Sequence, residues 1–134
     1  MTELNFSHSS NSTPPRAFLP VLEKVKNVYF LWYGFYQTLP KTHRHSLGQK
    51  IDTLFVEIIE MIATASFLKK EEKIPYVKFA IRKTDTLKIL LMVLWETKSL
   101  DNKKYIALST PLDEIGKMLG GWNGQLQKQN SPTK

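Results

Sequence analysis

Apolar residues recur at alternating spacings of four and three along two long segments of the chain. In the first segment, from about Phe18 to Leu39, the repeat runs through Phe18, Leu22, Val25, Tyr29, Trp32, Tyr36 and Leu39. In the second, from about Leu47 to Lys70, it runs through Leu47, Ile51, Leu54, Ile58, Met61, Ala65 and Leu68. A seven-residue repeat of this kind places an apolar stripe along one face of a helix that packs against other helices. We therefore predict an all-α protein built from long, packed helices.

Two further segments complete a set of four predicted helices. The third runs from about Pro75 to Thr97, and its stretch "LKILLMVLW" is apolar on nearly every side. The fourth runs from about Asn102 to Leu119 and contains Pro111, so it either kinks there or ends and restarts. The three connections are short, which requires neighbouring helices to run antiparallel. The prediction is an antiparallel up-down four-helix bundle.

The predicted bundle occupies the middle of a chain of 134 residues. That length suits a single domain with a sizeable hydrophobic core. Residues 1–16 are mostly polar, and residues 123–134 have a similar composition, so both segments are predicted to be disordered tails. The bundle is therefore expected to span residues 17–122.

Apolar residues also lie beside the predicted stripes, including Val21, Val28, Leu31 and Phe35 in the first helix and Phe55, Ile59 and Ile62 in the second. A monomeric bundle needs one apolar stripe per helix, so we expect the surplus to be buried where subunits meet. The alternative is that these extra side chains pack under loops within a single chain.

Several classes of function lack the residues that they require. The sequence has no cysteine, which excludes disulfides, thiol catalysis and cysteine-ligated zinc. It contains no Glu-x-x-His pair, and His43 and His45 flank Arg44, whose charge disfavours a metal site. No phosphate-binding loop, catalytic triad motif, secretory signal or membrane-spanning apolar run is present. We expect a cytoplasmic protein with no enzymatic activity, no cofactor, no metal and no membrane partner.

Positive charge indicates the class of partner. Nineteen Lys and Arg residues against twelve Asp and Glu residues give a net charge of +7. An excess of this size favours polyanionic partners, above all nucleic acid. The predicted nucleic-acid-binding residues form two groups: Lys41, Arg44 and Lys50 at the corner between the first two helices, and Lys78, Arg82 and Lys83 on the third helix. Such side chains contact phosphates without reading sequence, although a merely solvated charged surface is the alternative.

Three glycines and a tryptophan near residue 120 are predicted to be structural. Gly120 or Gly121 is expected to adopt the left-handed conformation that closes a helix. Gly116 is expected to allow the close approach of Trp122 or of a neighbouring helix, which would make Trp122 a buried anchor. The competing interpretation is that Trp122 is an exposed platform on which a base stacks.

Two motifs resemble the accessory variability determinant (Avd) proteins of diversity-generating retroelements, a family of four-helix bundles. The first is a Pro40-Lys41 corner that leads into Leu47, Gly48 and Ile51. The second, "EIGKMLGGW", spans residues 114–122. The resemblance covers about residues 18–122, and Pro111 departs from the family pattern. Related bundle proteins are encoded in intervening sequences of bacterial large-subunit ribosomal RNA genes.

The resemblance implies a non-enzymatic protein that assembles as a barrel-like homopentamer. Such a protein binds the reverse transcriptase of the retroelement and its template RNA or cDNA, and so supports mutagenic cDNA synthesis. RNA and DNA would bind without strong sequence preference. The alternative is an orphan oligomeric bundle with a general RNA-binding or structural role, like the proteins of the ribosomal RNA intervening sequences. A membrane-surface or metabolite-binding bundle is a third class that the sequence leaves open.

Overall fold

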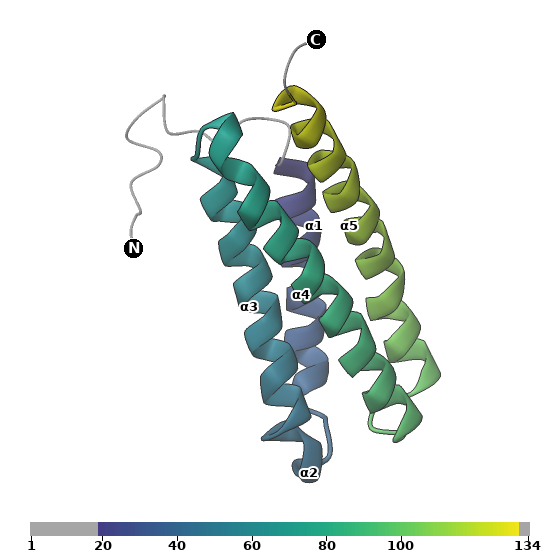
Figure 1. Cartoon of the computed structure of the whole chain (residues 1–134). Coiled ribbons are helices and arrows are strands. Elements are labelled where there is room, and N and C mark those ends of the chain that lie inside the picture. The colour runs from purple at the N-terminus through teal and green to yellow at the C-terminus, as the bar shows by residue number, and fades with distance from the viewer. Residues whose placement is uncertain (1–18, 132–134) are drawn as a thin grey trace.

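The long elements of the protein are all helices. A computed structural model describes residues 19–131, and no strand occurs among them. The helices are α1 (Leu19–Tyr36), α2 (Lys41–Arg44), α3 (Leu47–Ser66), α4 (Lys70–Glu96) and α5 (Asn102–Gln129). Helix α2 is a single turn, and Figure 1 shows the other four lying side by side as a bundle. The predicted all-α bundle is confirmed, whereas the predicted tail at residues 1–16 lies outside the described residues.

Each long helix packs against two others. Helix α1 contacts α3 and α5, and α4 likewise contacts α3 and α5. The short α2 and the loop between α4 and α5 lie at one end of the bundle, where Figure 1 places them at the bottom. The turn between α3 and α4 lies at the other end, together with the end of α5. The connections on either side of α2 and between α4 and α5 therefore share one end of the bundle, and the turn between α3 and α4 lies at the other.

Helix α4 starts five residues before the position predicted from Pro75. It begins at Lys70, and the Glu72 carboxylate accepts a hydrogen bond from the Lys69 backbone N–H at 3.3 Å. Two acidic residues in the first turn, Glu71 and Glu72, stabilise the positive end of the helix dipole. These local charges explain why the helix begins before the proline.

Helix α5 is longer than predicted and unbroken. It passes through Pro111 and continues beyond the glycines to Gln129, and no described glycine has a positive φ. The predicted left-handed turn at Gly120 or Gly121 is therefore wrong, and so is the predicted start of a tail at residue 123. The reason is tertiary: Leu126 is 3% exposed and packs with Ala65 and Val77 in a small second core. Burial of the Leu126 side chain contributes about 1.5–3 kcal/mol, which counters part of the roughly 1 kcal/mol that each of the four glycines of α5 costs.

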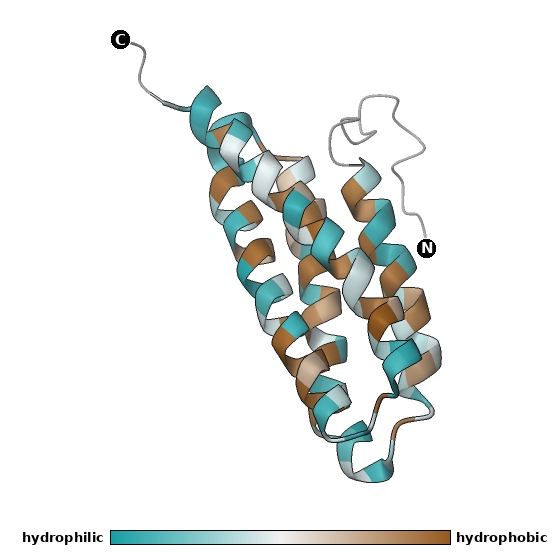
Figure 2. Ribbon diagram, turned by 90° about the vertical axis from the view of Figure 1, so that its right-hand side faces the viewer, coloured by the Kyte–Doolittle hydropathy of each residue, from teal (hydrophilic) through white to brown (hydrophobic). Residues whose placement is uncertain are grey.

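The main core lies between the four long helices. The apolar stripes predicted for the first two helices face this core, as expected. Trp32, Phe55 and Ile58 are fully buried in it, facing Leu91 and Leu112 from the other pair of helices. Figure 2 shows hydrophobic and hydrophilic residues alternating along each helix, as expected where one face is buried and another is exposed. The remaining stripe residues of α1 and α3 are buried or half-buried, and Phe18 lies outside the described residues.

Most of the predicted surplus apolar side chains pack inside the protomer. Of the seven named in the first two predicted helices, only Leu31 is exposed, because the others turn into the core or its margins. A different set of large apolar side chains faces solvent: Phe30, Tyr33, Val56, Phe79, Ile89, Trp95 and Ile106. Apolar surface is therefore available for a partner, through Ile89 and Trp95 of the predicted apolar stretch "LKILLMVLW" and through residues of other helices that periodicity did not single out.

One polar contact crosses the core margin between α1 and α3. The Trp32 indole N–H donates to an Asp52 carboxylate oxygen at 3.3 Å. Tyr29 lies beside the same carboxylate. The pKa of Tyr29 is raised to about 12. The largest cause is burial, and the hydrogen bond to Asp52, the Asp52 charge and the Tyr33 charge add to it.

None of the described helices is long and apolar enough to cross a membrane.

Candidate nucleic-acid interface

A tight corner between α1 and α3 positions the first group of predicted cations. Leu39 is buried three residues after α1 ends, and α3 begins so close to the corner that Gly48 has no room for a side chain. A Cβ atom on Gly48 would lie 2.9 Å from the His43 carbonyl oxygen and 2.9 Å from Leu39 Cδ1. Glycine at this position therefore allows the turn α2 to fold directly onto the start of α3.

The corner is joined to the loop between α4 and α5. His43 Nδ1 lies 2.6 Å from Ser99 Oγ, which links the two connections by a hydrogen bond. Lys104 Nζ donates to Thr38 Oγ1 at 3.2 Å and lies 5.4 Å from the centre of the Phe35 ring. Residues far apart in sequence thus form one surface, which we call the basic end. Its cations are Lys41, Arg44, Lys50, Lys98, Lys103 and Lys104.

Most cations of the basic end are available to solvent. Lys41, Lys50, Lys98 and Lys103 are exposed, and within residues 19–131 none of these four makes an ion pair with a carboxylate. The nearby Asp101 carboxylate caps α5 by accepting the Lys104 backbone N–H at 2.8 Å. Uncompensated lysines clustered on one surface attract a polyanion such as nucleic acid.

Arg44, which was predicted to bind phosphate, also contacts the backbone of the corner. Its Nη2 donates to the Leu39 carbonyl oxygen at 3.0 Å. Its Nε is buried without a hydrogen-bond partner among the described residues. The guanidinium is therefore partly committed to the fold.

The side chains of the second predicted group, on α4, do not all lie on the same face of the helix. Lys78 and Arg82 are exposed, and the Arg82 guanidinium lies 4.9 Å from the centre of the Phe79 ring. Lys83 turns toward α3, where its Nζ lies 3.0 Å from Glu57 Oε1. Lys83 is thus largely neutralised and does not share the surface of Lys78 and Arg82.

Arg82 lies away from the basic end. Fourteen residues of α4 separate it from the end of the helix at Glu96, which corresponds to about 21 Å at 1.5 Å per residue. Two separate basic surfaces result, one at the end of the bundle and one along α4.

Sequence reasoning missed three cations of the basic end: Lys98, Lys103 and Lys104. They lie in the stretch "KSLDNKK", which spans residues 98–104. In an up-down bundle the first and third connections are at the same end. The predicted topology could therefore have placed this lysine-rich connection beside Lys41.

The glycines of α5 do not serve the close contacts predicted for them within the protomer. A Cβ atom added to Gly116, Gly120 or Gly121 would meet nothing within 4 Å. Trp122 is half-buried and packs against both core clusters. Its predicted importance for stability stays a prediction.

Comparison with known protein families gives an independent assignment. A family model described as bAvd-like matches residues 20–126. The chain belongs to the bAvd-like family. The match begins in α1 and ends at Leu126, so it includes the part of α5 beyond the glycines. No curated protein and no solved structure gives a significant match to this bAvd-like chain.

Proposed function

We propose that this bAvd-like protein is a non-enzymatic accessory protein of a diversity-generating retroelement. It binds the reverse transcriptase together with template RNA or cDNA and supports mutagenic cDNA synthesis in the cytoplasm. Membership of the family, which is of an accessory, non-catalytic type, carries the proposal. The uncompensated lysines of the basic end support its nucleic-acid component.

Nucleic acid binds through phosphates in this proposal. Lys41, Lys50, Lys78 and Arg82 are exposed, as the predicted binding residues need to be, and Lys98 and Lys103 add to the basic end. Lysine contacts to phosphates release counterions and carry no sequence information, so binding is salt-dependent and tolerant of sequence.

Assembly as a homopentamer is the second component. Phe30 is 62% exposed and Tyr33 is 56% exposed on the outer face of α1. Val56 is also exposed and follows Asp52 by one turn, on the side of α3 that faces α1. Exposed aromatic side chains of this size are typical of surfaces that a partner covers. An assembly would repeat the basic end around its axis, so that modest contacts of each chain sum to strong binding.

The test is co-purification of the full chain with the reverse transcriptase encoded beside its gene, with and without nuclease. We expect a complex that survives nuclease, because the proposal includes direct protein contact. A complex lost on nuclease treatment would show that RNA bridges the two proteins. Failure under both conditions would favour the orphan RNA-binding or structural bundle. So would a gene with no neighbouring reverse transcriptase and no template and variable repeats.

A further inference from the structure

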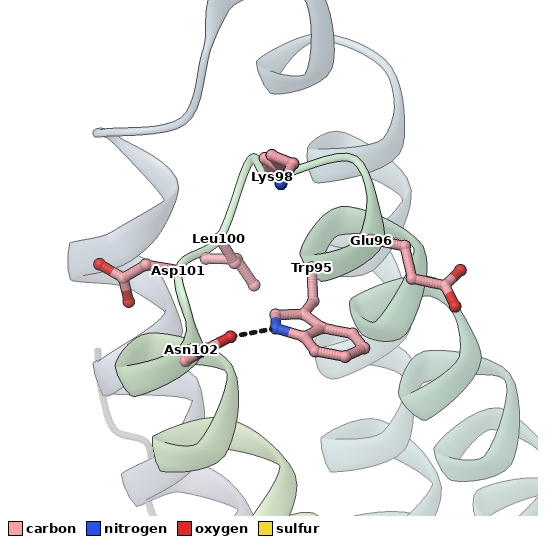
Figure 3. Close-up of a pocket in the computed structure, with 6 residues that line it drawn as sticks. All are labelled: Trp95, Glu96, Lys98, Leu100, Asp101 and Asn102. Atoms are coloured by element: carbon pink, nitrogen blue, oxygen red, sulfur yellow. Dashed lines mark hydrogen bonds between the residues drawn. The ribbon is translucent and has the colours of Figure 1, made fainter.

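A hollow of about 590 Å³ lies at the basic end, where α4 stops and α5 begins (Figure 3). It is a depression that is open to solvent and not an enclosed cavity. Its lining combines one aromatic ring with charged and amide groups: Trp95, Glu96, Lys98, Leu100, Asp101 and Asn102. None of these residues belongs to the binding surface predicted from sequence.

The Trp95 indole is held in a defined orientation. It stacks on Tyr105 with ring centroids 5.1 Å apart and planes inclined by 16°. Its N–H donates to Asn102 Oδ1 at 2.6 Å, the hydrogen bond drawn in Figure 3. Trp95 nevertheless remains 37% exposed. A fixed and accessible indole is a suitable platform for a flat aromatic ligand, because little side-chain freedom is lost when the ligand stacks.

Lys98 occupies a backbone position that usually belongs to glycine. Its φ of 68° is the only positive φ of a non-glycine residue among residues 19–131. The Lys98 N–H donates to the Trp95 carbonyl at 3.0 Å, and the Ser99 N–H donates to the Leu94 carbonyl at 2.8 Å. This pair of bonds is the Schellman closure of a helix, in which glycine is preferred at the left-handed residue. A lysine here places a cation at the edge of the hollow at the cost of backbone strain. Strain of this kind is concentrated at functional sites in proteins.

The lining of the hollow carries one cation, Lys98, and two carboxylates, Glu96 and Asp101. Lys103 and Lys104, in the first turn of α5, add two further cations at the same end of the bundle. The carboxylates of Glu96 and Asp101 point away from the indole in opposite directions (Figure 3). Asp101 is also occupied as the cap of α5. The indole is thus stacked on Tyr105 but still 37% exposed, and Lys98 provides a site for a flanking phosphate at the edge of the hollow.

We infer that the hollow beside Trp95 binds an unpaired nucleobase of single-stranded RNA or DNA, which stacks on the indole while Lys98 contacts a flanking phosphate. The inference rests on the proposed function, because the strand is recruited by the basic end. Stacking on an aromatic side chain tolerates every base, so it adds affinity without sequence preference. It also gives the protein a preference for single strands over duplexes, whose bases are stacked on one another.

The test compares strands of equal charge with and without bases. Fluorescence anisotropy would measure binding of the full chain to labelled oligo(rU), oligo(dT) and an abasic strand of the same length. We expect the abasic strand to bind about fivefold more weakly or worse, since stacking of one base changes affinity by at least that factor. Trp95→Leu should bring the base-bearing strands to within about twofold of the abasic strand, and Trp95→Phe should restore part of the difference.

Matched variants separate stacking from charge and from folding. Phe67→Leu removes an exposed aromatic ring at the opposite end of the bundle, next to the turn between α3 and α4, and should leave the preference for bases unchanged.

Lys98→Gly removes the ammonium and also the backbone strain of a non-glycine residue at positive φ, so it should raise the melting temperature. It should also lower the salt dependence of single-strand binding by about 0.7 in log–log slope, the value for one lost phosphate contact. An unchanged slope would remove Lys98 from the site, and a lower melting temperature would show that the backbone at Lys98 is not strained.

A second measurement needs no variant. Irradiation of the wild-type protein with a 5-iodouridine strand should produce a cross-link that mass spectrometry maps to Trp95 or Tyr105. Cross-links confined to other residues would overturn the inference.

A free mononucleotide, UMP, should compete only at far higher concentration, because it lacks the neighbouring phosphates. Competition by UMP as strong as that of the strand would identify a nucleotide site instead.

The outcomes distinguish the inference from the proposed function. Equal binding of base-bearing and abasic strands would leave nucleic-acid binding in place and remove the base site. A preference for bases that survives Trp95→Leu would place the stacking elsewhere. Absence of binding to every strand would reject both the inference and the nucleic-acid component of the proposed function.

Discussion

Glycine serves opposite purposes at two positions of this chain. At Gly48 the space that a Cβ atom would need is already filled by the His43 carbonyl and the Leu39 side chain. At Gly120 a Cβ atom would meet nothing within 4 Å, and the residue is exposed on a continuous helix. The first glycine is required by packing, whereas the second only weakens its helix.

Alanine substitutions at these positions should therefore change stability in opposite directions. Gly48→Ala should lower the free energy of unfolding by about 1–3 kcal/mol, the cost of inserting a methyl group into a packed site. Gly120→Ala should raise it by about 1 kcal/mol through helix propensity. Denaturant unfolding of both variants beside the wild type measures the two changes. A destabilising Gly120→Ala would contradict the prediction and show that another chain packs closely on this face of α5.

Tyr29 should make stability depend on pH in the alkaline range. Its pKa is about 12 in the folded protein against 10.0 ordinarily, so the folded state retains the phenolic proton longer than the unfolded state. The resulting stabilisation is fully present below about pH 10 and is lost as the pH rises toward about 12. Between about pH 9 and about pH 11, urea unfolding should show a larger loss of stability for the wild type than for Tyr29→Phe.

Lys73 acts in the opposite direction but does not disturb this comparison. Burial lowers the pKa of Lys73, so the folded protein gains stability as the pH rises toward the ordinary lysine value of 10.5. Both proteins contain Lys73, and its contribution cancels in their difference. Parallel pH profiles of wild type and Tyr29→Phe would show that Tyr29 does not titrate differently on unfolding.

At the scale of elements, the single turn α2 and the loop between α4 and α5 form the basic end together. The hydrogen bond between His43 and Ser99 joins them, and Lys104 reaches across to Thr38. On α4, by contrast, two lysines pair with carboxylates of neighbouring helices: Lys83 with Glu57 and Lys88 with Asp113, each at 3.0 Å.

Two pairs of lysines with equal charge should therefore contribute unequally to RNA binding. Lys41→Ala with Lys103→Ala should weaken binding and lower the log–log salt slope for single-stranded RNA by about 1.4, or about 0.7 for each phosphate contact. Lys83→Ala with Lys88→Ala removes the same charge but from side chains already paired with carboxylates, so the slope should change much less. Anisotropy titrations over a range of salt concentrations measure both slopes. Equal effects of the two pairs would show that binding follows net charge and not the basic end.

At the scale of the whole molecule, the protomer combines a closed core with an exposed apolar face on α1. Phe30 and Tyr33 are both more than half exposed, although the same helix buries Trp32 completely. The core is thus complete without these two rings. An assembly in which another protomer covers Phe30 and Tyr33 would explain why the isolated protomer leaves them exposed.

Charges introduced on this face should dissociate the assembly. We expect light scattering of the wild type to give about five times the protomer mass of 15.5 kDa. Phe30→Glu with Tyr33→Glu should give the protomer mass while circular dichroism stays helical, because an interface cannot bury unpaired carboxylates. Phe67→Glu, which places a carboxylate at one end of the bundle, should leave the assembly intact. A wild-type protein of protomer mass at micromolar concentration would contradict the assembly.

Local patterns in the sequence determined the fold class and the basic character of the protein. The spacing of Ile51, Leu54 and Ile58 predicts a helix whose buried face the structure confirms, because helical periodicity depends only on residues three and four apart. The motifs around Gly48 and at residues 114–122 resembled the Avd family, and the family match agrees with that resemblance.

Tertiary contacts decided what depends on residues far apart in sequence. Helix α5 continues past its glycines because Leu126 packs against Ala65 and Val77, which no local pattern around Gly120 records. Lys83 is neutralised by Glu57 from another helix, whereas Lys98 and Lys103 join the basic end through the contact of two connections. Charge and periodicity are properties of a segment, but the partner of a charge and the end of a helix depend on which segments meet in space.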